Sequence, residues 1–419
     1  MKMYRISIAL AFCFAAVSAN ALTVEECQQL ARENYPLIKR YGLIERSESY
    51  SLANASRGYL PQVSFMAQAT YQSDVTEMPL NNLPLPIAID PLTKDQYKAV
   101  VDVSQTIWDG GVIGKQRKIV RASAEVEQKQ VDADLYAINR RVNNLFFGIL
   151  LFNEQMRQNV LMMGELQRSY DEVSAYIANG IANQSDLDAV KVNQLSIKQR
   201  QTELETNRKA YCDMLAYFMG VDINAGTLQK PVASLLAGQD INRPELALMD
   251  AQYRQLETQK SLLTAKNLPK LGAFFQGGYG KPGLNMLKND FELYYIVGAR
   301  LTWNFSGLYT QKNERRVLAV NQSAIQTQRE TFLFNTGVEL TQQNSEVDKL
   351  RKLMADDDEI IRLRHNIRKA SEIKVANGTL TVTDMLSDLT AEDQARQNKA
   401  LREIQLLMSI YEIKNTTNN

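Results

Sequence analysis

Two short segments of the chain share a glycine that is followed six residues later by an aspartate. NGIANQSDL at 179–187 returns as NGTLTVTDM at 377–385, so Gly180 and Asp186 correspond to Gly378 and Asp384. An aspartate in the first turn of a helix is favoured by the helix dipole. This structural role alone would explain both aspartates, and a functional role for two exposed carboxylates is the alternative.

The sequence contains no constellation of catalytic residues. His365 is the only histidine, and it stands apart from residues that could share a reaction or a metal with it. There is no Ser-His-Asp set, no metal-ligand spacing and no phosphate-binding glycine loop. We therefore expect no enzyme, no catalytic residue, no cofactor and no metal. A net charge of +1 also argues against a nucleic-acid partner, for which a basic stripe is expected.

The amino terminus is typical of a secretory signal. Lys2 and Arg5 precede an apolar run at 6–17 and the small residues Ala19-Asn20-Ala21, which predicts residues 1–21 as a signal peptide cleaved after Ala21. The apolar run is too short to span a bilayer, and no other stretch reaches about 18 apolar residues. Cys13 lies inside the apolar run, so we do not expect it to carry a lipid.

Cleavage would leave Cys27 and Cys212 as the remaining cysteines. Two cysteines in an exported protein could pair, but they do not form a disulfide framework. We expect two separate thiols packed on helices.

Four segments alternate between apolar and polar residues at period two, which predicts strands. They lie at 63–71, 97–104, 271–279 and 291–303, after an expected helix at 22–58. The polar segments 73–96 and 280–290, rich in Pro, Asn or Gly, are expected to be exposed loops between paired strands.

A very long helix is expected after each pair of strands. Residues 114–177 contain no proline, and apolar residues recur there at a 3–4 spacing, the coiled-coil heptad: Leu135, Ile138, Val142, Leu145, Ile149, Phe152 and Met156. Asn179-Gly180 should end this helix, and Ser185 should cap the returning one. A helix at about 310–376, a stop at Asn377-Gly378 and a cap at Thr383 repeat the arrangement.

The order of elements predicts an internal duplication. The first repeat spans 22–243 and includes a linker at 220–243, and the second spans 244–419, each with two strands and a long helical hairpin. Ten-residue strands with one apolar, aromatic-rich face suit a membrane β-barrel. Because a sheet in lipid must close, and four strands cannot, several chains must share one barrel. Three copies of four strands would make a 12-stranded barrel.

Several motifs together resemble the TolC-type outer-membrane efflux proteins, also called outer membrane factors. They are LTVEECQQLARENYPLIK at 22–39, Leu60-Pro61 and Leu268-Pro269, IWDGG at 107–111, NFSG at 304–307 and the two glycine–aspartate turns. The resemblance implies a transmembrane β fold joined to α-helices: a trimeric 12-stranded barrel in the outer membrane of a Gram-negative cell, continuous with a helical barrel of coiled coils in the periplasm.

The resemblance also implies a function and partners. The chain would be the passive exit duct of a tripartite efflux or type I secretion system. A homotrimer in outer-membrane lipid would receive cargo from a proton-driven or ATP-driven inner-membrane pump through a periplasmic membrane-fusion adaptor. The lumen of such a duct is wide and polar, so cargo specificity would lie in the pump.

The family docks its adaptor and gates its channel at the tips of the helical hairpins. By resemblance, the docking residues are Asn179, Gly180, Ile181, Ser185, Asp186, Asn377, Gly378 and Thr379. Asp384 and Asp388 would form acidic rings at the aperture. Val375 and Leu380 stand where the best-studied member has a tyrosine and an arginine that lock this aperture. We therefore expect an apolar constriction, or the aspartates alone, to act as the gate.

Other polar and aromatic residues have two interpretations each. Asp102 and Arg300 lie on the predicted lumen faces, where they could tune ion selectivity or simply be solvated. Trp108 and Trp303 lie at the ends of strands, where they could belong to an aromatic belt at the membrane interface or simply pack between the barrel and the helices. The acidic run 356–359 and the arginines that follow it, Arg362, Arg364 and Arg368, are expected to form a solvated face.

Two other kinds of protein would share parts of this pattern. A secreted coiled-coil scaffold or adhesin without a pore would have no use for four aromatic-bearing strand segments. A periplasmic pump adaptor would need one helical hairpin and β-rich domains that carry it, whereas this sequence predicts two hairpins and barrel strands.

Overall fold

The structure, a computed structural model, describes residues 21–76, 92–223, 228–233 and 240–419. The expected signal peptide, apart from Ala21, and most of the first polar loop lie outside these residues. The chain divides into two compact units. The helical unit comprises the chain up to Ile38, Asp132–Arg243 and Phe332–Asn419, and the sheet unit comprises Lys39–Val131 and Pro244–Thr331.

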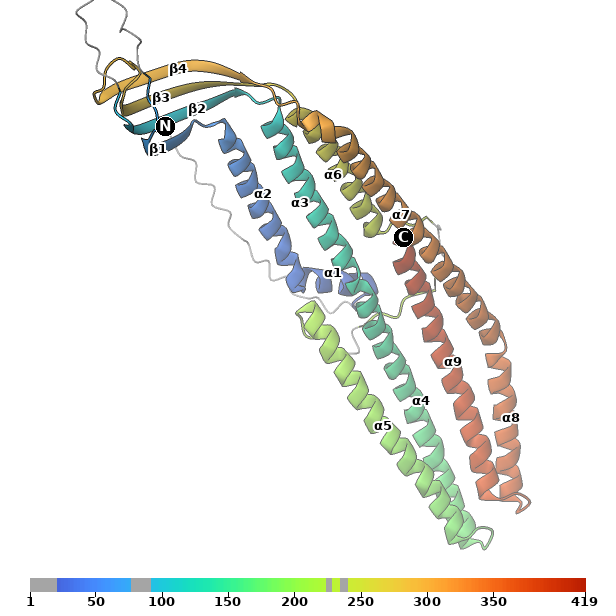
Figure 1. The fold of residues 1–419 in the computed structure, drawn as a ribbon. Coiled ribbons are helices and arrows are strands. Elements are labelled where there is room, and N and C mark those ends of the chain that lie inside the picture. The colour runs from blue at the N-terminus through green and yellow to red at the C-terminus, as the bar shows by residue number, and fades with distance from the viewer. Residues whose placement is uncertain (1–20, 77–91, 224–227, 234–239) are drawn as a thin grey trace, which may run out of the picture. The chain divides into compact units, whose positions relative to one another are not determined.

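The sheet unit contains one four-stranded antiparallel sheet in the order β1-β2-β3-β4 (Figure 1). The strands are β1 (Gln62–Tyr71), β2 (Asp95–Trp108), β3 (Lys270–Lys281) and β4 (Glu292–Thr302), which confirms all four predicted segments to within a few residues. The unit also contains α2 (Arg40–Ser56) and α6 (Pro244–Lys266). A bulge shifts the β2–β3 register between Thr106 and Trp108.

The register separates the sheet into an apolar face and a polar face. Residues directly opposite one another across strands point to the same side, and odd-numbered residues pair with odd-numbered ones throughout most of the sheet, as in the row Val63, Val103, Phe275 and Val297. Large exposed side chains on this apolar face are Val63, Phe65, Tyr71, Tyr97, Val101, Phe275, Tyr279, Leu293, Tyr295, Val297 and Leu301.

The even-numbered residues form the polar face. It carries Ser64, Gln68, Lys98, Asp102, Ser104, Thr106, Lys270, Gln276, Glu292 and Arg300, interspersed with glycines and with Met66, Val100, Phe274, Tyr294 and Ile296. The assignment of Asp102 and Arg300 to the polar faces of their strands is therefore confirmed.

The helical unit is built from two hairpins of long helices (Figure 1). One consists of α4 (Ile138–Ala178) and α5 (Gln184–Met219), and the other of α8 (Asp357–Ala376) and α9 (Val382–Thr417). Helix α1 (Val24–Asn34) packs against α4 and α5, and α9 packs against α4.

Two further helices, α3 (Val112–Tyr136) and α7 (Gly307–Ala355), have residues in both units. The expected uninterrupted helices at 114–177 and 310–376 are each broken by one residue. Ala137 separates α3 from α4, and Asp356 separates α7 from α8. Both residues keep right-handed helical dihedrals, so only the hydrogen-bond ladder is interrupted.

The expected helix at 22–58 is also broken, because of a proline. Helix α1 ends at Asn34, and Tyr35 is extended with φ −65° and ψ 131°. The ring of Pro36 disfavours the helical conformation for the residue before it. A short 3₁₀ turn, Pro36–Lys39, then leads into α2.

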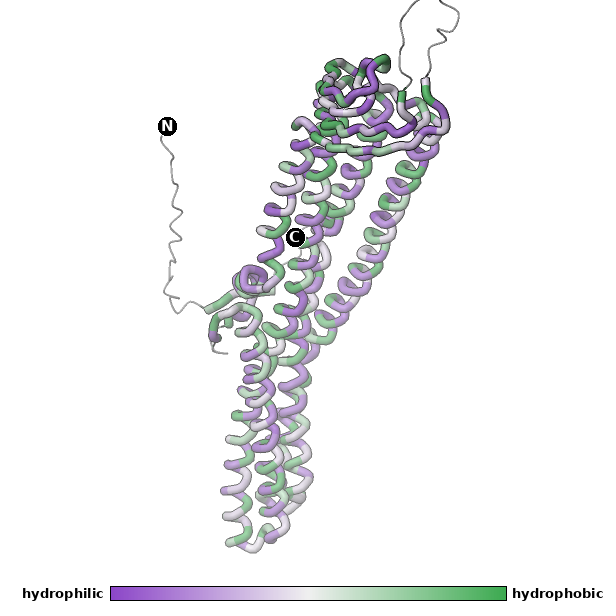
Figure 2. Tube along the Cα trace, turned by 60° about the vertical axis from the view of Figure 1, so that its left-hand side comes forward, coloured by the Kyte–Doolittle hydropathy of each residue, from purple (hydrophilic) through white to green (hydrophobic). Residues whose placement is uncertain are grey.

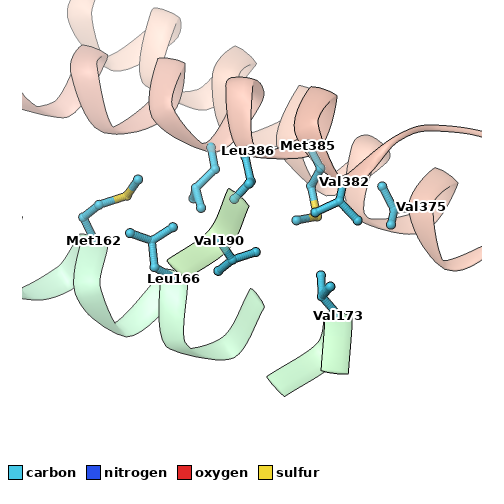
Figure 3. Packing of buried hydrophobic residues seen from close by; sticks show 9 residues of the cluster. Met162, Leu166, Val173, Val190, Val375, Val382, Met385 and Leu386 are labelled. Atoms are coloured by element: carbon cyan, nitrogen blue, oxygen red, sulfur yellow. The ribbon is translucent and has the colours of Figure 1, made fainter. Parts of the chain in front are cut away.

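The two hairpins share an apolar core (Figure 3). Figure 3 shows side chains of α4 and α5 pointing toward those of α8 and α9. The cluster comprises Met162, Leu166, Val173, Val190, Val375, Val382, Met385, Leu386 and Leu389. Farther from the hairpin tips, the predicted heptad residues Leu135, Ile138, Val142, Leu145 and Ile149 are buried, which confirms the 3–4 spacing as a packing seam.

Figure 2 shows hydrophilic and hydrophobic residues interspersed along the helical segments. Within the described ranges, none of the helices is long and apolar enough to cross a membrane.

Candidate functional site

The tips of the two hairpins have the same backbone geometry. Gly180 and Gly378 adopt left-handed dihedrals with φ 72° and 67°. Around Gly180, the amide of Ile181 donates to the carbonyl of Tyr176 at 2.9 Å and that of Gly180 donates to Ile177 at 3.1 Å. These two bonds define a Schellman motif, which needs a residue tolerant of positive φ. The second tip has the same two hydrogen bonds: the amide of Gly378 donates to the carbonyl of Val375, and that of Thr379 donates to the carbonyl of Lys374.

The helices that return from the tips are capped by residues two positions earlier than expected. Asn183, not Ser185, caps α5: its side chain accepts the amide of Asp186 at 3.2 Å, and Asp186 Oδ2 accepts the amide of Asn183 at 3.0 Å. Thr381, not Thr383, caps α9 and accepts the amide of Asp384 at 3.1 Å. Each two-residue shift places the aspartate at the third helical position. There Asp186 completes a capping box with Asn183, whereas the carboxylate of Asp384 accepts the hydroxyl of Thr381 at 2.6 Å.

Replacing Asn183 with alanine should weaken the start of α5 by about 1 kcal/mol, because the amide of Asp186 loses its acceptor. Hydrogen exchange of the amides in the first turn of α5 measures this loss. Ser185→Ala is the matched control and should change the stability by less than about 0.5 kcal/mol, because the Ser185 hydroxyl only donates to Asn183 Oδ1. Equal effects of the two changes would contradict the assigned cap.

The expected docking and aperture residues differ in exposure. Asn179, Gly180, Ile181, Ser185, Asn377, Gly378, Thr379 and Asp384 are exposed at the tips, and Asp186 is half-buried. Val375 is only 2% exposed and belongs to the apolar core between the hairpins, with Leu380 packed against it. Asp388 is half-buried and accepts a hydrogen bond from Ser371 Oγ at 2.5 Å.

A buried arginine joins the two hairpins at the end of this core that is farther from the tips. The Arg368 side chain in α8 is 6% exposed. Its Nη1 lies 2.6 Å from Glu165 Oε2 in α4 and 3.0 Å from Glu372 Oε1, and its Nε lies 2.8 Å from Glu392 Oε2 in α9. One guanidinium therefore forms ion pairs with carboxylates from three helices.

Glu392 is the second centre of this cluster and its side chain is also 6% exposed. Its Oε1 lies 2.6 Å from Arg396 Nη2 and 3.2 Å from His365 Nδ1. Burial alone would raise the pKa of Glu392, but the hydrogen bond from Arg396 and the charge of Arg368 outweigh burial and lower it. Glu392 is therefore held in its ionised form.

The expectation that the charges of 356–368 form a solvated face is wrong in two places. Asp357 is buried and pairs with Arg402, and Arg368 is buried as described. A signal for Arg368 exists in the sequence: Arg368, Ser371 and Val375 follow the 3–4 spacing of a packing seam. Arg362, by contrast, pairs with Glu359 on the surface as expected.

Asp393, next to Glu392, is an acid with a strongly shifted pKa. Burial raises the pKa of Asp393 to about 6, and the charge of Glu392 adds to the rise, while Arg200, Arg396 and a 2.5 Å hydrogen bond from Gln397 oppose it. The folded state thus binds a proton more tightly than the unfolded state does, so its stability should fall as pH rises from about 4 through about 6.

Replacing Asp393 with asparagine should remove this dependence. We expect Asp393→Asn to stabilise the helical unit by about 1–2 kcal/mol at pH 7.5 and to have little effect at pH 4.5. Thermal unfolding of the detergent-solubilised protein at the two pH values provides the measurement. An equal effect at both pH values would contradict an ionised, buried Asp393.

Both described cysteines are free and buried, which confirms two separate thiols. Burial, with the charges of Glu26 and Glu25 adding to it, raises the pKa of Cys27 to about 12. A thiol with so high a pKa is unreactive. In the described part of the chain, no three side chains of His, Cys, Asp or Glu gather where they could hold a metal ion.

Comparison with known proteins finds a similar sequence family for part of the chain and similar folds among solved structures. The family of outer membrane efflux proteins matches residues 28–220. Among curated proteins, no sequence match was found.

Solved structures share the fold over nearly the whole chain. The CmeC outer membrane channel of Campylobacter jejuni is 12% identical with a TM-score of 0.62, covering 94% of this chain and 85% of that one. The outer membrane protein VceC of Vibrio cholerae is 11% identical with a TM-score of 0.65, covering 93% and 95%. The open MtrE outer membrane channel of Neisseria gonorrhoeae is 13% identical with a TM-score of 0.65, covering 97% and 93%.

Proposed function

We propose that the chain is an outer membrane efflux protein, as the match of that family to residues 28–220 supports, and that three copies form the exit duct of a tripartite efflux or type I secretion system. The observation that carries the proposal is the two-faced sheet. Eleven large apolar side chains, among them Phe65, Leu293 and Tyr295, are exposed on one face, and charged and amide side chains occupy the other. Such a sheet suits lipid on one side and water on the other.

Closure of this sheet requires more than one copy. Strands β1 and β4 are the edges of the four-stranded sheet. An unpaired strand edge is not tolerated in hydrocarbon, because its backbone groups would lack hydrogen-bond partners. Pairing of β1 in one copy with β4 in the next would close a 12-stranded barrel when three copies take part.

The hairpin tips are the proposed contact with a periplasmic membrane-fusion adaptor. Ile181, 47% exposed, and Thr379 lie in turns that present the same backbone geometry twice per copy. Repeated tips would give an adaptor quasi-equivalent sites around the mouth of the duct. Asp384 and Asp388 are proposed to line this aperture, with Val375 and Leu380 supporting it from the core between the hairpins.

The proposal places the protein in the outer membrane of a Gram-negative cell, after removal of residues 1–21, with the helical unit in the periplasm. An inner-membrane pump, proton-driven or ATP-driven, would deliver the cargo and determine its identity. No chemical step is assigned to the chain, because transport through such a duct is passive.

In-cell crosslinking tests the proposed partner. A photo-crosslinking amino acid at Thr379 should capture a periplasmic adaptor, identified by mass spectrometry, and the same group at the surface-exposed Arg362 of α8 is the matched control. Recovery of the adaptor at Thr379 supports docking at the tips. Capture of extracellular proteins, with the chain missing from outer-membrane fractions, would overturn the duct in favour of a secreted scaffold.

A further inference from the structure

Charged residues are unevenly distributed along the strands on the polar face of the sheet. Near the loops, Lys98 and Glu292 lie in one cross-strand row, through Gly280. Asp102 lies in a middle row with Gln276. The rows nearest the helices hold two cations, Arg300 opposite Gly272 and Lys270 opposite Thr302, and the strand residues of these rows include no carboxylate.

These two cations border a cleft of about 420 Å³. Its lining also includes Ser104, Thr106, Phe274 and Thr302 and the aliphatic residues Val112, Ile113 and Leu271. The carboxylate among the lining residues belongs to Asp109, which is 7% exposed. Its two oxygens accept the amides of Gly111 at 2.8 Å and Ile113 at 2.6 Å at the start of α3, so both are already engaged.

The position of Arg300 is set by packing on the same face. Its guanidinium carbon lies 4.7 Å from the centre of the Phe274 ring. Phe274 in turn lies over Gly298, where a Cβ atom would come within 3.0 Å of the ring. Because Gly298 has no side chain, the Phe274 ring can pack against the backbone there, which holds the ring in place. The cation–π contact with this ring then positions the Arg300 guanidinium.

Neither Arg300 nor Lys270 forms an ion pair with any residue that the structure describes. Some cations in the described helices of the sheet unit do form ion pairs, as Arg254 does with Glu125 and Arg329 with Asp250. Two neighbouring cations without a carboxylate partner repel one another, and an anion between them would relieve that repulsion.

We propose that Lys270, Arg300 and Phe274 form a binding site for multivalent organic anions on the polar face of the sheet. The proposal rests on the proposed channel, in which three copies would bring two such cations each to one ring around the lumen. Guanidinium binds carboxylate and phosphate oxygens in a bidentate fork, and Phe274 offers an apolar surface to the rest of the molecule. Because the apolar face lies on the opposite side of the sheet, the anion is a solute of the lumen rather than a lipid.

Block of single channels in planar bilayers tests this site. Inositol hexakisphosphate, added on the side of the strand loops at 0.1 M salt, should interrupt the current of the wild-type protein. The double change Lys270→Gln and Arg300→Gln should weaken the block about 10- to 100-fold. Each ion pair between the anion and an exposed cation contributes modestly, but the double change removes two cations from every copy around the lumen. Block should also weaken in 1 M salt, where charges are screened over about 3 Å.

Two variants separate charge from folding. Arg300→Lys keeps the charge and should retain most of the block. Lys98→Gln removes a cation from the loop end of the same face and should leave the block unchanged. Normal conductance with equal block in the wild type and the double variant would overturn the anion site alone. An inserted protein that passes no current would overturn the channel and this site together.

Discussion

Replacing Arg368 with methionine should lower the free energy for opening α8 and α9 by about 3–5 kcal/mol. The change removes the cation that faces Glu165, Glu372 and Glu392. Glu392 would keep Arg396 and His365, but Glu165 and Glu392 would then repel one another across the gap between the hairpins. Native-state hydrogen exchange of the amides in α8 and α9 measures the opening free energy.

The matched control is Arg362→Met on the same helix. Arg362 and Glu359 are more than half exposed and should contribute about 0–1 kcal/mol. Combining Arg368→Met with Glu392→Gln should recover part of the loss, because the double variant removes one of the unpaired carboxylates. Similar exchange rates in Arg368→Met and Arg362→Met would show that the buried cluster does not hold the hairpins together.

Replacing Val297 with arginine should abolish assembly in the outer membrane. Val297 lies at the middle of β4 on the apolar face and is 69% exposed. An arginine facing lipid at the bilayer midplane costs about 2–4 kcal/mol, and a symmetric trimer would incur this cost in every copy. The amount of trimer in purified outer-membrane fractions measures the effect.

Ile296→Arg is the control next to it. Ile296 lies on the polar face, in the row of Asp102 and Gln276, so its arginine would enter water and trimer should still assemble. A normal amount of membrane-inserted trimer with Val297→Arg, or loss with Ile296→Arg alone, would show that the two faces have been assigned the wrong way round.

Much of the fold could be predicted because it depends on local periodicity. The alternation of Leu293, Tyr295 and Val297 with Tyr294 and Ile296 specifies a strand and its two faces without reference to any partner. The 3–4 spacing through Val142 and Ile149 likewise specifies a helix and its buried side. The two glycines at the tips were predictable because a left-handed cap strongly favours glycine.

The helix starts could not be placed as well. Asn183 and Ser185, like Thr381 and Thr383, are all good capping residues, and the sequence does not rank them. The choice depends on where the backbone leaves the Schellman turn: the residue that caps is the one with extended dihedrals, ψ 173° at Asn183 and 153° at Thr381.

The buried charge cluster depends on tertiary structure. Arg368 pairs with Glu165, which is 203 residues away in the sequence, and no local sequence pattern predicts such a pair. The charges around Arg368 suggested a solvated surface, and only its place in the seam with Ser371 and Val375 indicated otherwise. Packing between hairpins, rather than local charge balance, decided which arginine was buried.

Conductance of the purified protein in planar lipid bilayers tests most directly whether three copies enclose one pore. We expect discrete, long-lived current steps from a trimer, and no steps from Val297→Arg. A trimer that inserts in the bilayer but never conducts, or steps that arise from a single copy, would contradict the proposed duct.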